Sequence, residues 1–88
     1  PESFSLSQNY PNPFNPSTLI EFTLPVKTNV ILKVFNILGQ EVRTLINGEL
    51  VEGKYKVNFD AKGLASGVYI YQISSNAFTL SKKMILQK

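Results

Sequence analysis

The sequence predicts an all-β protein, a seven-stranded antiparallel immunoglobulin-like β-sandwich with Greek-key connections. Three observations support this prediction. Polar and apolar residues alternate with a period of two through most of the chain, as in Lys54–Asp60. Turn-forming residues separate these runs at the short intervals typical of a sandwich. No segment places apolar residues at helical spacing between capping residues, so we expect no helix of any length.

The clearest strands are five alternating runs. They cover residues 19–24, 29–38, 54–60, 68–75 and 78–86. In the second run Val30, Leu32 and Val34 share one face, and in the fourth run Tyr69, Tyr71 and Ile73 do. Each run therefore has one face suited to a core, and Pro25 ends the first of them.

Short polar segments between the runs predict tight turns. Leu38-Gly39-Gln40 and Asn47-Gly48 both contain a glycine that adopts positive φ at low cost. Asn76 is expected to close the hairpin between the last two strands. At the corner before Tyr69, we expect the tyrosine hydroxyl to bind upstream backbone, as in many Greek-key sandwiches. Leu64 would then close the end of the core, and Gly67 would permit a tight approach of the chain.

The segment QNYPNPFNPST at residues 8–18 contains three prolines, three asparagines and no charge. The prolines lock φ and remove N–H donors, which predicts an ordered loop rather than a strand. We expect Tyr10 and Phe14 to bury their rings, and the asparagines to bind local backbone in Asx turns. The predicted structural loop includes Pro11, Asn12, Pro13, Asn15 and Pro16. A recognition surface for a partner is the alternative interpretation of this segment.

The bulk composition limits the class of protein. The 88 residues suffice for a single domain, and the absence of cysteine means that the core must hold the fold without disulfides. The net charge is +3, and the chain has no cluster of arginines. Both facts argue against a surface that binds nucleic acid. Tyrosine apart, the longest apolar runs span three residues, so we expect no membrane span. The start at Pro1, with no export signal in sight, suggests a fragment of a longer chain.

The sequence offers little for catalysis or cofactor binding. It has no His and no Cys, one aspartate, and glutamates without a pairing pattern. Ser66 lies in an Ala-Ser-Gly turn with no base nearby in sequence. Asparagine oxygens without carboxylates would bind Ca²⁺ weakly, and no phosphate-binding glycine loop is present. We therefore expect neither an enzyme nor a bound cofactor or metal.

Four blocks of sequence in a fixed order resemble a known family. They are QNYPNPFNPST at 8–18, VFNILGQEV at 34–42, LASGVYIYQI at 64–73 and the KKMILQK ending. Together they resemble the type A C-terminal sorting domain of the Por (type IX) secretion system, from about Leu6 to Lys88. The chain is also similar to the immunoglobulin-like module of flagellar hook-capping proteins.

The resemblance implies a module at the C-terminus of proteins secreted by Bacteroidetes and neighbouring phyla. The cargo would pass through the periplasm, cross the outer membrane through the type IX translocon and reach the cell surface or the medium. The implied partners are an outer-membrane β-barrel shuttle protein and a sortase-like cysteine peptidase that removes the domain. The implied recognition residues fall in two groups, Gly67, Val68 and Tyr69 in one block and Lys82, Lys83 and Lys88 in the terminal strand.

Two further expectations come from the residues themselves. A last strand that runs to the chain end can lie at a sheet edge, where strand addition by a partner or by a second copy is possible. The alternative is that Lys82 and Lys83 only protect this edge against aggregation. A structural or carbohydrate-binding sandwich attached to a secreted hydrolase is the competing function, although the chain has no tryptophan for a sugar-binding face.

Overall fold

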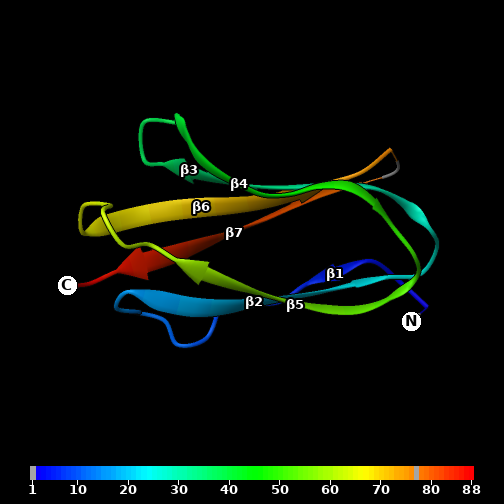
Figure 1. The fold of residues 1–88 in the computed structure, drawn as a ribbon, viewed down its shortest axis with the longest axis horizontal. Coiled ribbons are helices and arrows are strands. Elements are labelled where there is room, and N and C mark those ends of the chain that lie inside the picture. Colours follow the sequence, from blue (N-terminus) through cyan, green and yellow to red (C-terminus); the bar gives the residue numbers. More distant parts are fainter. Residues whose placement is uncertain (1, 77) are drawn as a thin grey trace.

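The structure, a computed structural model, describes residues 2–76 and 78–88. Seven strands form a sandwich of two sheets (Figure 1). The strands are β1 (Ser5–Leu6), β2 (Ser17–Leu24), β3 (Thr28–Asn36), β4 (Glu41–Leu50), β5 (Gly53–Asp60), β6 (Gly67–Ser74) and β7 (Thr79–Leu86).

One sheet has the order β1-β2-β5 and the other the order β4-β3-β6-β7, with every strand pair antiparallel. The chain changes sheet after β2, after β4 and after β5. The predicted immunoglobulin-like sandwich is therefore confirmed. β1 and β5 are the edges of the smaller sheet, and β4 and β7 are those of the larger one.

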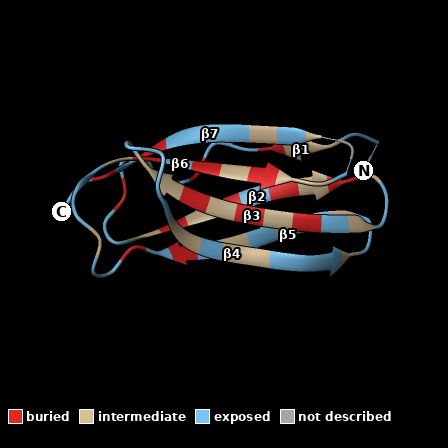
Figure 2. Cartoon of the chain, turned by 90° about the horizontal axis from the view of Figure 1, so that it is seen from above, coloured by how far each residue is buried: buried red, intermediate tan, exposed pale blue. Residues whose placement is uncertain are grey.

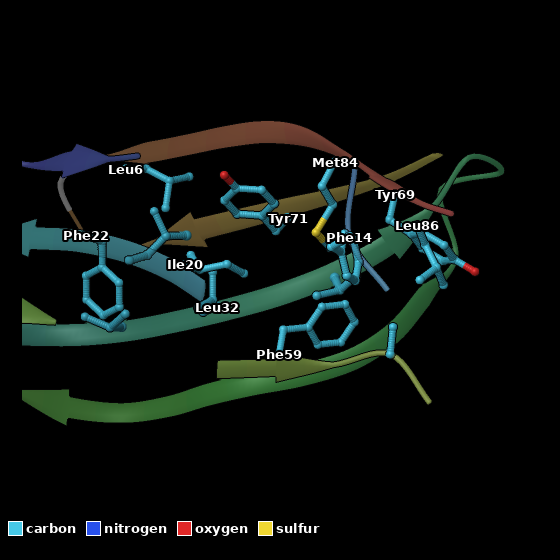
Figure 3. Close-up of a cluster of buried hydrophobic side chains, with 14 of the residues drawn as sticks. Leu6, Phe14, Ile20, Phe22, Leu32, Phe59, Tyr69, Tyr71, Met84 and Leu86 are labelled. Atoms are coloured by element: carbon cyan, nitrogen blue, oxygen red, sulfur yellow. The ribbon is translucent and has the colours of Figure 1, made fainter. Parts of the chain in front are cut away.

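The core lies between the sheets because alternate residues of each strand point inward. Val30, Leu32 and Val34 are fully buried, as the alternation in β3 predicts. Tyr71 and Ile73 of β6 are fully buried too, and Tyr69 is nearly so. Figure 2 shows buried positions alternating with intermediate or exposed ones along the strands, and Figure 3 shows the side chains meeting between the two sheets.

The five alternating runs all correspond to observed strands, but β1 and β4 were not located by their patterns. The predicted turn at Asn47-Gly48 is wrong, because both residues lie inside β4 and pair with Ile31 and Val30. Pairing with β3 along its whole length outweighs the local turn preference of the two residues. The chain turns later, at Val51 and Glu52. The turn at Gly39 is confirmed, with φ of 83°, and Asn76 lies between β6 and β7 as expected.

The corner before β6 has the predicted tyrosine bond. The Tyr69 hydroxyl donates to the carbonyl oxygen of Ala65 at 2.6 Å, and Leu64 packs partly buried against the core. The prediction that Gly67 permits a tight approach is wrong, because nothing lies within 4 Å of the place where a Cβ would stand. The backbone there has φ of 151°, so the conformation is what favours glycine.

Among the residues that the structure describes, no helix is long and apolar enough to cross a membrane.

Candidate recognition site

The terminal strand β7 lies at the edge of the larger sheet, next to β6. Its last residues pair with the start of β6, Met84 opposite Tyr69, Ile85 opposite Val68 and Leu86 opposite Gly67. The fold therefore brings the Gly67-Val68-Tyr69 block and the end of the terminal strand into direct contact. Two blocks that are separate in the sequence form one place in the structure.

The opening segment, residues 4–14, borders the outer edge of β7, the edge that faces away from β6. At one end of the strand the Phe4 and Phe78 rings stack with centroids 3.7 Å apart. Towards the other end, Phe14 forms an isolated parallel bridge with Leu86. The two ends of the chain thus lie side by side, and the sandwich is closed on this side.

Hydrogen bonds join this segment to the edge of β7. The Gln8 side chain donates from Nε2 to the Lys83 carbonyl oxygen at 2.7 Å. The Ile85 N–H donates to Asn12 Oδ1 at 3.0 Å, and the Ile85 carbonyl accepts from the Phe14 N–H at 3.0 Å. The Gln87 N–H then donates to the Phe14 carbonyl, also at 3.0 Å. These bonds occupy outward backbone groups of β7 that an added strand would need.

A buried polar network holds the opening segment against the core. The Asn9 N–H donates to the Tyr71 hydroxyl oxygen at 2.8 Å, and that hydroxyl donates to the Ser7 carbonyl at 2.6 Å. Asn9 Nδ2 donates to Thr18 Oγ1 at 3.0 Å and to the Pro11 carbonyl at 3.1 Å. Asn9 and Thr18 are both buried, so these bonds satisfy groups that water does not reach.

The surroundings of the Tyr71 hydroxyl in this network change its pKa. Burial raises its pKa to about 12, although the bond from the Asn9 N–H works in the opposite direction. At neutral pH the hydroxyl therefore keeps its proton and both donates and accepts. The central hydroxyl of the network is thus fixed in its neutral form.

Of the two rings expected to anchor the opening segment, only one is buried. Phe14 is 2% exposed and lies 6.0 Å from Phe59, ring centroid to ring centroid. The prediction for Tyr10 is wrong, because this side chain is 80% exposed. The Tyr10 backbone exchanges two hydrogen bonds with Leu19, which holds the chain at the sheet while the ring extends into solvent. The Tyr10 ring is therefore accessible at the surface.

The other predicted loop residues have separate positions. The peptide bonds that precede Pro11, Pro13 and Pro16 are cis. Asn9 makes the expected local bond, to Pro11 two residues on. Asn12 does not, because its side-chain oxygen Oδ1 accepts a hydrogen bond from the Ile85 N–H of the terminal strand instead. Asn15 is exposed at the end of the loop, just before β2.

The three lysines of the terminal strand do not form one cluster. Lys83 pairs with Ile70 on the outer face of the larger sheet, and Lys82 points to the opposite face, where Tyr71 also points. Both lysines are exposed because β7 is an edge strand. Lys88 lies beyond the strand, and its N–H donates to Ser66 Oγ at 3.1 Å. Ser66 therefore holds the chain end in place.

Around Lys83 the outer face of the sheet is apolar. Ile70 and Ile85 are both 38% exposed, and Val68, which pairs with Ile85, is half-buried. Tyr10, Lys83 and Ile85 are exposed in the two segments that the Asn12–Ile85 bond joins, and we term these three residues the joined-ends surface. It combines one aromatic, one aliphatic and one cationic side chain, and of these tyrosine belongs to the residue types enriched at protein interfaces.

Sequence analysis did not identify the residues that join the two ends, chiefly Gln8, Asn9, Thr18 and Tyr71. One signal was available, because a tyrosine at a core position needs a partner for its hydroxyl. The uncharged pair Gln8-Asn9 before the prolines was a candidate for that partner. Nothing in the pattern links Gln8 to Lys83, because the contact depends on how the sheets pack.

Comparison with known proteins identifies the family of the chain. A sequence model of the family described as "Secretion system C-terminal sorting domain" matches residues 8–87. The matched region begins and ends at residues that take part in the contact between the opening segment and β7. No curated protein and no solved structure matches the chain. The family match covers nearly the whole sequence, and the chain therefore belongs to the C-terminal sorting domains of the type IX secretion system.

Proposed function

We propose that the joined-ends surface is the part of this sorting signal that the type IX translocon recognises. The observation that supports it most directly is the pair of bonds that Ile85 makes with Asn12 and Phe14. These bonds hold the terminal strand in a defined position relative to the Pro/Asn-rich loop. A receptor can then recognise both ends of the domain together, and only when the domain is folded.

Recognition at residues 83–87 uses exposed side chains rather than strand addition. The outward backbone groups of Ile85 are already bonded to the opening segment. An added strand would have to displace Asn12 and Phe14, and Phe14 is buried in the core. The partner of this surface is the outer-membrane β-barrel shuttle protein. A sortase-like cysteine peptidase then removes the domain, and the cargo is attached to the surface or released.

In this pathway the cargo is first exported to the periplasm by a separate signal. The domain supplies the second signal, for the outer membrane, and takes no part in the activity of the cargo. Its contribution is the surface that folding assembles from the two ends of the chain.

A transport assay tests the proposal. A fluorescent protein with a periplasmic export signal is fused to residues 1–88 and expressed in a host with type IX machinery. One variant lacks Met84–Lys88, a second carries Tyr10→Ala with Ile85→Ser, and a translocon-deficient strain is the negative control. Val26→Ser serves as the matched variant, because Val26 is exposed in the turn between β2 and β3, outside the joined-ends surface.

We expect the wild type and Val26→Ser to reach the surface or the medium only when the translocon works. The deletion and the double substitution should remain in the periplasm, with the double variant still folded by circular dichroism. Normal transport of a folded Tyr10→Ala, Ile85→Ser variant would contradict the assignment of this surface.

A further inference from the structure

The four sheet edges of the sandwich are not equally open. The edge of β7 is bonded to the opening segment, and β1 is two residues long. The pairing of β4 with β3 shifts twice, which leaves Val42 and Leu45 as extra residues in β4. Such bulges disturb an edge and protect it from pairing. β5 differs from all three, because its eight residues pair with β2 in one unbroken register.

One hydrogen bond just beyond β5 shows which of its residues direct their N–H and C=O groups away from β2. The Ala61 N–H donates to the Pro16 carbonyl, on the side of β2. Because strand backbone groups alternate in direction, the odd-numbered residues of β5 bond to β2 and the even-numbered ones point away. The outward residues are Lys54, Lys56, Asn58 and Asp60, and all four side chains are exposed.

We propose that this edge of β5 binds β5 of a second copy of the chain, in antiparallel register about Val57. Antiparallel pairing places Lys54 opposite Asp60 and Lys56 opposite Asn58 of the other copy. Both members of each pair have outward backbone groups, so these are hydrogen-bonded pairs of the new ladder. The two three-stranded sheets thereby become one continuous sheet, related by a twofold axis.

Charge and the number of hydrogen-bonded pairs together select this register over its neighbours. In the proposed register each Lys54 faces an Asp60, and no two like charges face each other directly. A slip by two residues in one direction places Lys56 opposite Lys56, which repels. The slip in the other direction loses one of the hydrogen-bonded pairs because the strand ends at Asp60. Asp60 binds the Lys62 N–H through Oδ1, which leaves its second oxygen for Lys54 of the other copy.

The inner side of this edge is also suited to a second copy. Tyr55 and Val57 of β5 are only half-buried, as are Val42 and Leu45 of the facing strand β4. On the opposite side of the sandwich, the opening segment and β1 close the space between the sheets. A second β5 would place its own Val57 and Tyr55 beside these side chains and remove apolar surface from water. This proposal is independent of the joined-ends surface, which lies on the other side of the sandwich.

Sedimentation equilibrium with residues 1–88 tests the charge pairing. We expect the wild type to form a dimer. Lys54→Glu alone or Asp60→Lys alone should raise the dissociation constant of the dimer about tenfold, because each change creates two like-charge pairs. An equal mixture of the two variants should recover the dimer as a heterodimer, because each position then again faces an opposite charge. A folded variant that does not weaken the dimer, or a mixture without recovery, would overturn the proposal.

A crosslinking experiment tests the register separately from charge. The chain has no cysteine, so Val57→Cys introduces a single thiol that would face its own copy in a non-hydrogen-bonded pair. We expect a disulfide dimer to form on mild oxidation. Ser81→Cys, on the outer side of β7, is the matched control and should form no disulfide-linked dimer under the same conditions. The β5 interface would be excluded if the wild type were monomeric and Val57→Cys gave no more disulfide dimer than Ser81→Cys. If Ser81→Cys gave more disulfide dimer than Val57→Cys, self-association would be assigned to β7.

Discussion

Asn9 and Tyr71, which lie 62 residues apart in the chain, share a buried hydrogen bond of 2.8 Å between the Asn9 N–H and the tyrosine hydroxyl. The same hydroxyl donates to the Ser7 carbonyl. One side chain of the core therefore satisfies two backbone groups of the opening segment. This contact places the segment where Gln8, Asn12 and Phe14 can bond to the terminal strand.

Replacing Tyr71 by Phe should lower the free energy of unfolding by about 2 kcal/mol, because the Asn9 N–H and the Ser7 carbonyl lose their partner. Urea denaturation measures this loss. Tyr10→Phe is the control, since its hydroxyl lies on an 80% exposed side chain and its removal should change the midpoint little. Equal effects of the two substitutions would show that the buried hydroxyl contributes no stability.

The raised pKa of Tyr71 predicts a loss of stability in alkali. The unfolded chain releases this proton near the ordinary pKa of 10.0, and the folded chain holds it to about 12. The contribution is therefore fully present below pH 10 and is lost as the pH rises from 10 to 12. The stability difference between wild type and Tyr71→Phe should shrink by roughly 2 kcal/mol over this range. A stability difference that stays constant between pH 10 and pH 12 would contradict the raised pKa of Tyr71.

Replacing Tyr69 by Phe should destabilise the fold by about 1 kcal/mol. The substitution removes the 2.6 Å bond to the Ala65 carbonyl but keeps the ring in the core. Amide exchange at residues 64–67 should accelerate more than exchange in β3, because the bond holds the corner before β6. Uniform acceleration through the domain would mean that the corner has no local stability of its own.

Truncating Phe14 to Ala should cost about 3–4 kcal/mol, because the ring is buried against Phe59. Exchange of the Ile85 and Gln87 amides should rise as the opening segment loosens. Tyr10→Ala is the matched aromatic truncation in the same loop and should cost less than about 0.5 kcal/mol. Thermal denaturation of the two variants side by side distinguishes the anchor from the exposed ring.

Gly67→Ala should destabilise the domain by about 1–2 kcal/mol, because alanine rarely adopts the φ of 151° that the start of β6 requires. Gly48 provides the comparison. Its backbone is not at positive φ and nothing lies within 4 Å of a Cβ at that position. Gly48→Ala should therefore be neutral or slightly stabilising. The ranking of the two urea midpoints checks the assignment of strain to Gly67.

Much of the fold was predictable because alternation is a local property. The runs at 54–60 and 68–75 carry their inward faces in every second residue, so the strand and its buried side follow directly. β4 was harder, because two bulges interrupt its period and Asn47-Gly48 resembles a turn. Its place depends on pairing with β3, which no window of the sequence contains.

The sequence by itself determined the all-β class, the inward faces of the main strands, the tyrosine corner at Tyr69 and the membership of the sorting-domain family. Each of these features depends on residues that are close to one another in the sequence, or on motifs in a fixed order along the chain. Only the tertiary structure decided that Tyr10, unlike Phe14, is exposed, that Asn12 binds Ile85, and that β5 keeps an open edge. The physical reason is that these features depend on contacts between residues far apart in the chain, which form only when the two sheets pack.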